Sequence, residues 1–157
     1  MRQKMLAGIV SLFAFAGCGG GESLGGLTAE RSFQVALTPA EEVPAPKPTS
    51  ASGTAVVVIY KDEIDYQLSA QNITGITMAH IHNGAPGVAG PIVVTLFMPG
   101  SPTGTVNGIF ASGTLDASNL PGGVTLESLK TLLNSGNAYV NVHTVANQPG
   151  EIRGQLR

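Results

Sequence analysis

Three histidines, His80, His82 and His143, are the residues of this chain whose type and spacing could do chemistry. Neutral imidazole nitrogens are good ligands for copper and zinc. His80 and His82 stand two residues apart in a strand-like run, residues 78–82, so their side chains share one face about 6.5–7 Å apart. Two imidazoles at that separation can chelate one ion. The spacing predicts a metal site if the fold brings His143 to the same place.

The faces of the surrounding strands decide whether His143 can join the pair. In residues 78–82, Ala79 and Ile81 alternate with the histidines and can enter the core. In residues 138–144, Val140 and Val142 form the corresponding core pair, so His143 points outward. All three histidines therefore occupy outward-facing strand positions. The alternative is that His80 and His82 are ordinary solvent-exposed residues of a strand and bind no metal.

The last strand-like run, residues 151–156, adds charged neighbours to this face. Ile152 and Leu156 point inward, which leaves Glu151 and Arg153 pointing outward. If this run pairs with residues 138–144 as a hairpin, facing residues share a face. We then expect His143 opposite or diagonal to Glu151 or Arg153. The simplest interpretation of these two charges is an exposed cross-strand ion pair, worth roughly 0.2–1 kcal/mol.

The rest of the chain must supply the framework for these strands. Short β-like runs separated by Gly, Pro, Asn and Ser predict an all-β sandwich or barrel. Residues 41–52 form a proline-rich loop that cannot pair well, because proline lacks the N–H. Leucines at helical spacing in residues 125–135, with Thr125 to cap the start and Gly136 to end it, predict one short helix. The predicted strands cover residues 32–37, 53–60, 64–70, 78–82, 92–97, 104–115, 138–144 and 151–156.

The N-terminus predicts export and a lipid anchor. Arg2 and Lys4 precede an apolar run, residues 5–15, that is too short to span a bilayer, which needs about 20 apolar residues. This pattern therefore predicts a signal peptide over residues 1–17, ending before Cys18. The chain has one cysteine, so it cannot form an internal disulfide, and a lipid on Cys18 would account for it. The alternative is an ordinary signal peptide with an incidental cysteine.

Residues 18–31 are then the lipidated cysteine and a glycine-rich flexible tether, and residues 32–157 are a single domain. No aspartate follows Cys18, so we expect the outer membrane or the cell surface rather than retention at an inner membrane. Charged residues make up 11% of the chain and the net charge is −2. Without a basic patch, the sequence does not favour nucleic-acid binding.

Five motifs, in order and covering about residues 32–156, resemble the CHRD domain, first named from chordin. This resemblance implies a secreted domain whose biochemical role is poorly defined. The motifs are LTPAEEVP at 37–44, SGTA at 52–55, AHIHNGAPG at 79–87, GNAYVNVHT at 136–144 and PGEIRGQL at 149–156.

A more distant resemblance is to copper/zinc superoxide dismutase. It implies an eight-stranded, antiparallel Greek-key β-sandwich in which His80, His82 and His143 look like copper ligands. Arg153 resembles the arginine that guides the anion to copper in that family. This chain has no fourth, bridging histidine, no His/Asp zinc-binding loop and no disulfide cysteines. These departures exclude a zinc half-site.

Copper is the expected metal, ahead of zinc, on this resemblance and on the Irving–Williams order. Three histidines would leave an open coordination position. Arg153 could hold a small anion there, and Glu151 or Asn141 could orient an imidazole N–H. The main hypothesis is an extracytoplasmic, lipid-anchored copper-binding domain. The alternatives are a metal-free binding or scaffold domain at the cell surface and a copper-dependent, dismutase-like enzyme.

Overall fold

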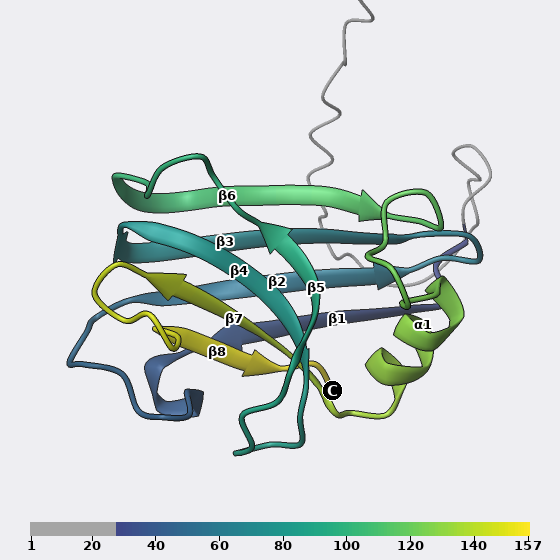
Figure 1. Ribbon diagram of the computed structural model, residues 1–157, viewed down its shortest axis with the longest axis horizontal. Coiled ribbons are helices and arrows are strands. Elements are labelled where there is room, and N and C mark those ends of the chain that lie inside the picture. The colour runs from purple at the N-terminus through teal and green to yellow at the C-terminus, as the bar shows by residue number, and fades with distance from the viewer. Residues whose placement is uncertain (1–27) are drawn as a thin grey trace, which may run out of the picture.

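The computed structural model describes residues 28–157 and shows two antiparallel sheets packed face to face (Figure 1). The predicted signal peptide, Cys18 and most of the predicted tether lie outside the described residues. One sheet has the order β1-β2-β3-β6, and the other has the order β5-β4-β7-β8. The strands are β1 (Arg31–Leu37), β2 (Ser52–Ile59), β3 (Ile64–Thr74), β4 (Ile76–Asn83), β5 (Ile92–Phe97), β6 (Thr105–Leu115), β7 (Ala138–Thr144) and β8 (Ile152–Gln155).

The strand order gives a sandwich with Greek-key connections. β3 pairs with β6, and β4 pairs with β7, although other strands intervene along the chain in each case. The connections from β3 to β4, from β5 to β6 and from β6 to β7 all pass from one sheet to the other. Long-range pairing of this kind characterises Greek-key sandwiches. The predicted all-β sandwich is confirmed.

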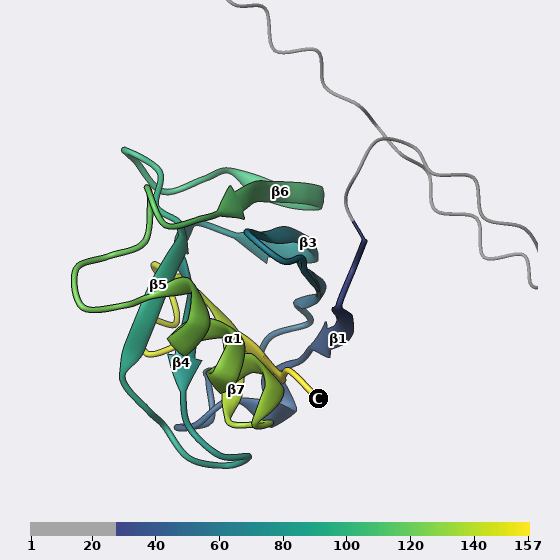
Figure 2. The same cartoon turned by 90° about the vertical axis from the view of Figure 1, so that its right-hand side faces the viewer.

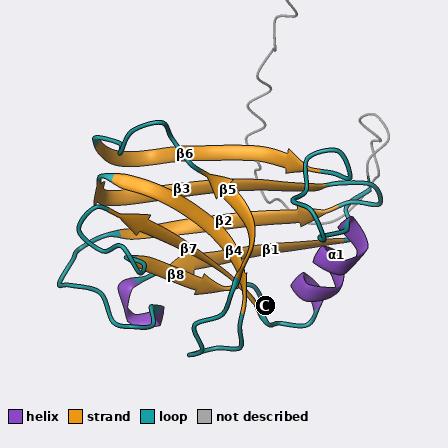
Figure 3. Cartoon of the chain, in the orientation of Figure 1, coloured by secondary structure: helices purple, strands orange, loops and turns teal. Residues whose placement is uncertain are grey.

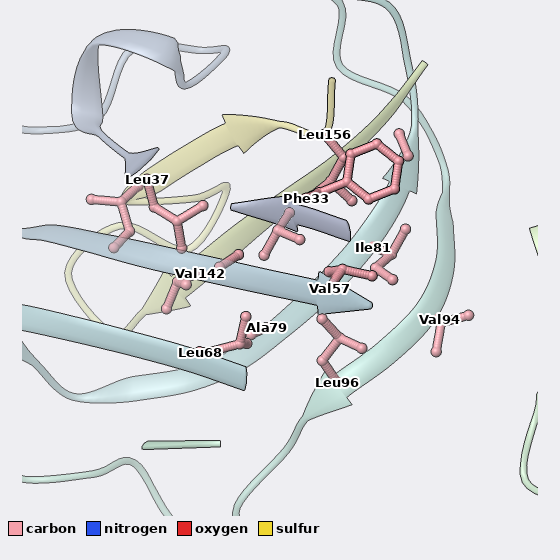
Figure 4. Packing of buried hydrophobic residues seen from close by; sticks show 14 of the residues in the cluster. Phe33, Leu37, Val57, Leu68, Ala79, Ile81, Val94, Leu96, Val142 and Leu156 are labelled. Carbon is pink, nitrogen blue, oxygen red and sulfur yellow. The ribbon is translucent and has the colours of Figure 1, made fainter. Parts of the chain in front are cut away.

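Alternating side chains from both sheets form the core (Figure 4), between the two layers of strands that Figure 2 shows from the side. In β4, Ala79 and Ile81 are fully buried between the sheets, as are Val140 and Val142 in β7. The alternation along β4 and β7 places every second side chain between the sheets, while the remaining side chains face the other side of their sheet. Other core residues seen in Figure 4 are Phe33, Leu37, Val57, Leu68, Val94, Leu96 and Leu156.

The two helical elements lie at the margins of the sandwich (Figure 3). The predicted short helix is confirmed as α1 (Leu126–Asn134), which buries Leu129 and Leu133. Thr125 and Ser128 exchange side-chain and backbone hydrogen bonds in a capping box that begins the helix. A 3-10 turn, η1 (Pro39–Glu41), starts the proline-rich loop that follows β1.

One edge of the sandwich is joined across the two sheets. The backbones of Thr38 and Arg153 exchange two hydrogen bonds of 2.9 and 3.1 Å, so the end of β1 pairs with β8. Residues at the end of the predicted tether also belong to the domain, because β1 begins at Arg31 and the Glu30 carboxylate contacts Lys130 at 3.1 Å. Within residues 28–157, no helix has the length and apolar character to cross a membrane.

The capping box predicts a measurable contribution to stability. Thr125→Ala removes the side-chain acceptor for the Ser128 N–H, so we expect the free energy of unfolding to fall by about 1 kcal/mol. Urea unfolding measures this change. Thr131→Ala, in the exposed middle of the same helix, is the matched control and should cost nothing, because alanine is a better helix former. Equal losses in the two variants would contradict the cap.

Candidate metal centre

The three histidines meet on the face of the β5-β4-β7-β8 sheet that points away from the core. His80 and His82 lie two residues apart on β4, and His143 lies on the neighbouring strand β7. In the register of the two strands, Met78 stands opposite His143 and His80 opposite Asn141. His143 is therefore a diagonal neighbour of His80, within reach of an imidazole. The expected convergence of the three side chains is confirmed.

The imidazole nitrogens point toward one another. One nitrogen from each ring belongs to a group of ligand atoms that all lie within 4.8 Å of one another. His80 Nδ1 and His143 Nε2 are 3.0 Å apart. The ring centroid of His80 lies 5.5 Å from that of His82 and 4.9 Å from that of His143. The three rings therefore surround one small volume.

Backbone carbonyls set the tautomers of two of these rings. His82 Nδ1 lies 2.9 Å from the Gly90 carbonyl oxygen, and His143 Nδ1 lies 2.8 Å from the carbonyl oxygen of Gln148. A carbonyl can only accept a hydrogen bond, so in both rings Nδ1 carries the proton. Each Nε2 is then left with its lone pair, which is the form that binds a metal.

The donor set fits a transition-metal ion. Bonds of about 2.0–2.1 Å in a tetrahedral site place ligand nitrogens roughly 3.4 Å apart. The nitrogens lie within 4.8 Å of one another, so they would have to approach by up to about 1.4 Å to reach that value. His82 Nε2 is also buried without a hydrogen-bond partner. To hold an ion, His80 would present the lone pair of Nδ1 and carry its proton on Nε2, because Nδ1 is the nitrogen that faces His143.

Sequence reasoning assigned the faces correctly but not the exposure. The histidines do point away from the core, yet His80, His82 and His143 are only 2%, 7% and 7% exposed. The turns at residues 84–91 and 145–150 contact two of the rings, and the loop of residues 39–51, here called the strap, lies beside the site where Glu42 meets Asn141. The turns supply the Gly90 and Gln148 carbonyls. The alternative that the histidines form a solvent-exposed strand surface is therefore wrong.

Hydrogen bonds hold the strap against the end of β7 and the start of β8. The Lys47 N–H donates to Asn147 Oδ1 at 2.8 Å, and Thr49 Oγ1 donates to Glu151 Oε1 at 2.6 Å. Glu42, from the start of the strap, is 5% exposed and its carboxylate accepts a bond from Asn141 Nδ2 at 3.5 Å. Polar residues thus fix a covering loop that the sequence could not place.

Burial makes all three histidines poor bases. Desolvation, followed by the neighbouring His143 and His82, lowers the pKa of His80 to about 4. Desolvation also lowers the pKa of His82, although the hydrogen bond to Gly90 opposes the shift, and it lowers the pKa of His143. The rings are therefore neutral at neutral pH, as metal binding requires.

Arg153 lies beside the histidines, but it is not open to solvent. Its side chain is 1% exposed, and its Nη2 donates to the Ala85 carbonyl at 3.2 Å and to Gln155 Oε1 at 3.3 Å. Its guanidinium carbon lies 3.4 Å from the centroid of the Tyr139 ring. Its Nη1 is buried without a partner. One nitrogen of the Arg153 guanidinium is therefore without a partner, while the other terminal nitrogen and the ring contact hold the group in place.

The two other polar candidates behave differently from each other. Glu151 does not pair with Arg153: its carboxylate accepts hydrogen bonds from Thr49 and Thr144, and the one salt bridge within residues 28–157 joins Lys130 to Glu30. The prediction of a cross-strand ion pair is wrong: Glu151 is bonded to the two threonines, while the Arg153 guanidinium bonds the Ala85 carbonyl and Gln155. Asn141 stands between His80 and Arg153 in the register, and its amide opposes the lowering of the His82 pKa that burial causes.

Sequence reasoning missed four residues that shape the site: Glu42, Gly90, Tyr139 and Gln148. Three of them lie in loops, where spacing carries no information about contact. Tyr139 could have been found, since it shares the outward face of β7 with Asn141 and His143. Its ring stacks on that of His82, with centroids 4.8 Å apart and an angle of 11° between the planes.

Fold and site together define a small, all-β sandwich domain with a buried cluster of three histidines. The family model of the CHRD domain matches residues 33–156, and the chain belongs to this family. No curated protein and no solved structure matches the chain. The resemblance to copper/zinc superoxide dismutase gains no support from these comparisons and stays a prediction.

The buried neutral histidines predict a loss of stability in acid. Between pH about 6.5 and about 4, His80 is protonated in the unfolded chain but not in the folded protein, so the free energy of unfolding falls as the pH falls. One histidine accounts for a slope of roughly 1.4 kcal/mol per pH unit. Denaturant unfolding across this range should show a smaller slope in His80→Asn.

The difference between the protein and this variant isolates His80, because the other titrating groups are common to both. Among them, Glu42 works in the opposite direction, since burial raises the pKa of its carboxyl. Equal slopes for the protein and His80→Asn would contradict the assignment of a neutral, buried imidazole.

Proposed function

We propose that this CHRD domain binds copper through His80, His82 and His143, as an exported protein held at a membrane by a lipid on Cys18. The observation that carries the metal proposal is the convergence of three imidazole nitrogens within 4.8 Å of one another. In two of the rings the metal-binding nitrogen is already free of its proton, because the other nitrogen donates to a backbone carbonyl.

The chemistry of the ligands favours copper over zinc and over hard cations. The cluster contains three neutral imidazoles, and no carboxylate belongs to it. Calcium and magnesium prefer oxygen ligands, while imidazole suits copper and zinc. Copper(II) binds such nitrogen sites more tightly than zinc at equal availability. A bound copper ion would supply one-electron redox chemistry, and three histidines would leave a coordination position for a further ligand.

The surroundings of Arg153 favour binding, storage or delivery of copper over a dismutase-like reaction. An arginine that guides anions from solvent must be reachable, whereas this side chain is 1% exposed and stacked on Tyr139. Its unpaired Nη1 could still bind a small anion that has already entered the site. We therefore place the copper-dependent enzyme behind the binding domain. The metal-free scaffold remains the alternative that metal analysis decides.

Metal analysis of the purified domain tests the proposal. We expect one copper ion per chain from copper-supplemented medium, and uptake close to zero in the double variant His80→Ala, His82→Ala. The matched control is Gln67→Ala, Ser69→Ala, which changes two residues at the same spacing on β3, in the other sheet. Circular dichroism checks that each variant folds. Copper retention by the histidine double variant, or its absence from the unaltered protein, would overturn the proposal.

The lipid anchor is tested separately in the full-length chain. We expect the protein expressed in a bacterium to enter the detergent phase in a Triton X-114 partition, since an acyl chain adds about 0.8 kcal/mol of membrane affinity per buried CH₂. Cys18→Ser should move it to the aqueous phase. If both forms partition alike, Cys18 carries no lipid and the chain is exported, if at all, by an ordinary signal peptide.

A further inference from the structure

We infer that Tyr139 positions His82 for metal binding, by stacking on its ring and by anchoring the Gly90 carbonyl that receives its N–H. This inference rests on the proposed function for its purpose, but the geometry that supports it involves no metal ion. Tyr139 is a positioning residue, because it acts through His82 and its hydroxyl hydrogen-bonds Gly90.

The first support is the packing around the tyrosine ring. Tyr139 stands opposite His82 in the pairing of β4 with β7, and their rings are nearly parallel, 11° apart in plane. The Arg153 guanidinium lies 3.4 Å from the Tyr139 centroid. Since β7 runs between β4 and β8, His82 and Arg153 approach Tyr139 from its two neighbouring strands. The tyrosine ring is held between a cation and the imidazole.

The second support is a hydrogen-bond chain through Gly90. The Gly90 N–H donates to the Tyr139 hydroxyl at 3.0 Å, and the Gly90 carbonyl accepts from His82 Nδ1 at 2.9 Å. Residue 90 has to be glycine, because a Cβ there would collide with the backbone carbonyl of Asn83. The tyrosine therefore holds the plane of the imidazole by stacking and its tautomer through the glycine it anchors.

Both effects act on the nitrogen that faces the cluster. With its proton fixed on Nδ1, His82 presents the lone pair of Nε2, and this nitrogen is buried without a partner. Without the stacked Tyr139 ring and the Gly90 hydrogen bond, the imidazole could rotate or change its tautomer. It would then present an N–H to the cluster, and a protonated nitrogen cannot bind a metal. Partners of this kind typically change metal affinity by 10–100-fold when they are removed.

Two substitutions at Tyr139 separate the stacking from the hydrogen bond. Tyr139→Phe keeps the ring and removes the hydroxyl, while Tyr139→Leu removes both. Tyr66→Phe is the matched control: it also deletes a tyrosine hydroxyl that hydrogen-bonds the main chain, here by donating to the Leu96 carbonyl at 2.7 Å, but outside the histidine cluster. Thermal unfolding shows how much stability each variant loses by itself.

The first readout is the imidazole ¹⁵N spectrum of the protein after chelator treatment. We expect His82 to be a single Nδ1–H tautomer in the unaltered chain and in Tyr66→Phe, and a mixture of tautomers in Tyr139→Phe. The second readout is the affinity for Cu(II) alone. We expect the dissociation constant to rise about 10-fold in Tyr139→Phe, more in Tyr139→Leu, and to stay unchanged in the control.

The two readouts distinguish failure of this inference from failure of the proposed function. If the unaltered protein binds no copper but Tyr139→Phe mixes the His82 tautomers, the metal proposal fails and the positioning role stands. If copper binds and Tyr139→Phe matches Tyr66→Phe in both tautomer and affinity, the positioning role is overturned. A loss of affinity with an unchanged tautomer spectrum in both Tyr139 variants would also overturn it.

Discussion

The register between β4 and β7 is the constraint on which the site depends. Ala79 and Ile81 must pair with Val142 and Val140 to keep four apolar side chains in the core. A slip of one residue would turn those side chains outward and bury the histidines in the apolar interior. The hydrophobic core thus fixes the diagonal relation of His80 to His143. The packing of the core therefore positions the three histidines, although their side chains lie outside that core.

Covering loops turn this arrangement from a surface patch into a buried centre. A pair of imidazoles on an open strand would titrate near neutral pH and exchange hydrogen bonds with water. Here all three rings are buried, and the Gly90 and Gln148 carbonyls from the two turns take the place of water as hydrogen-bond acceptors. Burial lowers the pKa of all three imidazoles, so the loops keep the rings neutral. The sheet supplies the spacing and the loops supply the electrostatic environment.

Local patterns predicted the strands, the capped helix and the faces of all three histidines, because alternation and capping are properties of neighbouring residues. They did not predict burial of those histidines, since the strap that contributes Glu42 lies nearly a hundred residues from Asn141 in the chain. Local patterns also gave the wrong partner for Glu151, which accepts a hydrogen bond from Thr49 and forms no ion pair with Arg153. Spacing along a strand gives the face of a side chain, but its partners in a covering loop depend on the whole fold.

If the histidine cluster has only a structural role, it lowers the free energy of unfolding. His82 Nε2 and Arg153 Nη1 are buried without partners, and an unsatisfied buried polar group costs about 1–3 kcal/mol. Apolar side chains of similar volume would fill the same space without this cost. Yet the surrounding residues fix the polar groups in place: Tyr139 stacks on His82, and Arg153 stacks on Tyr139. The two orphaned groups call for different partners: a metal ion, as proposed above, would satisfy the lone pair of His82 Nε2, whereas the Arg153 Nη1 donor needs an acceptor such as a small anion.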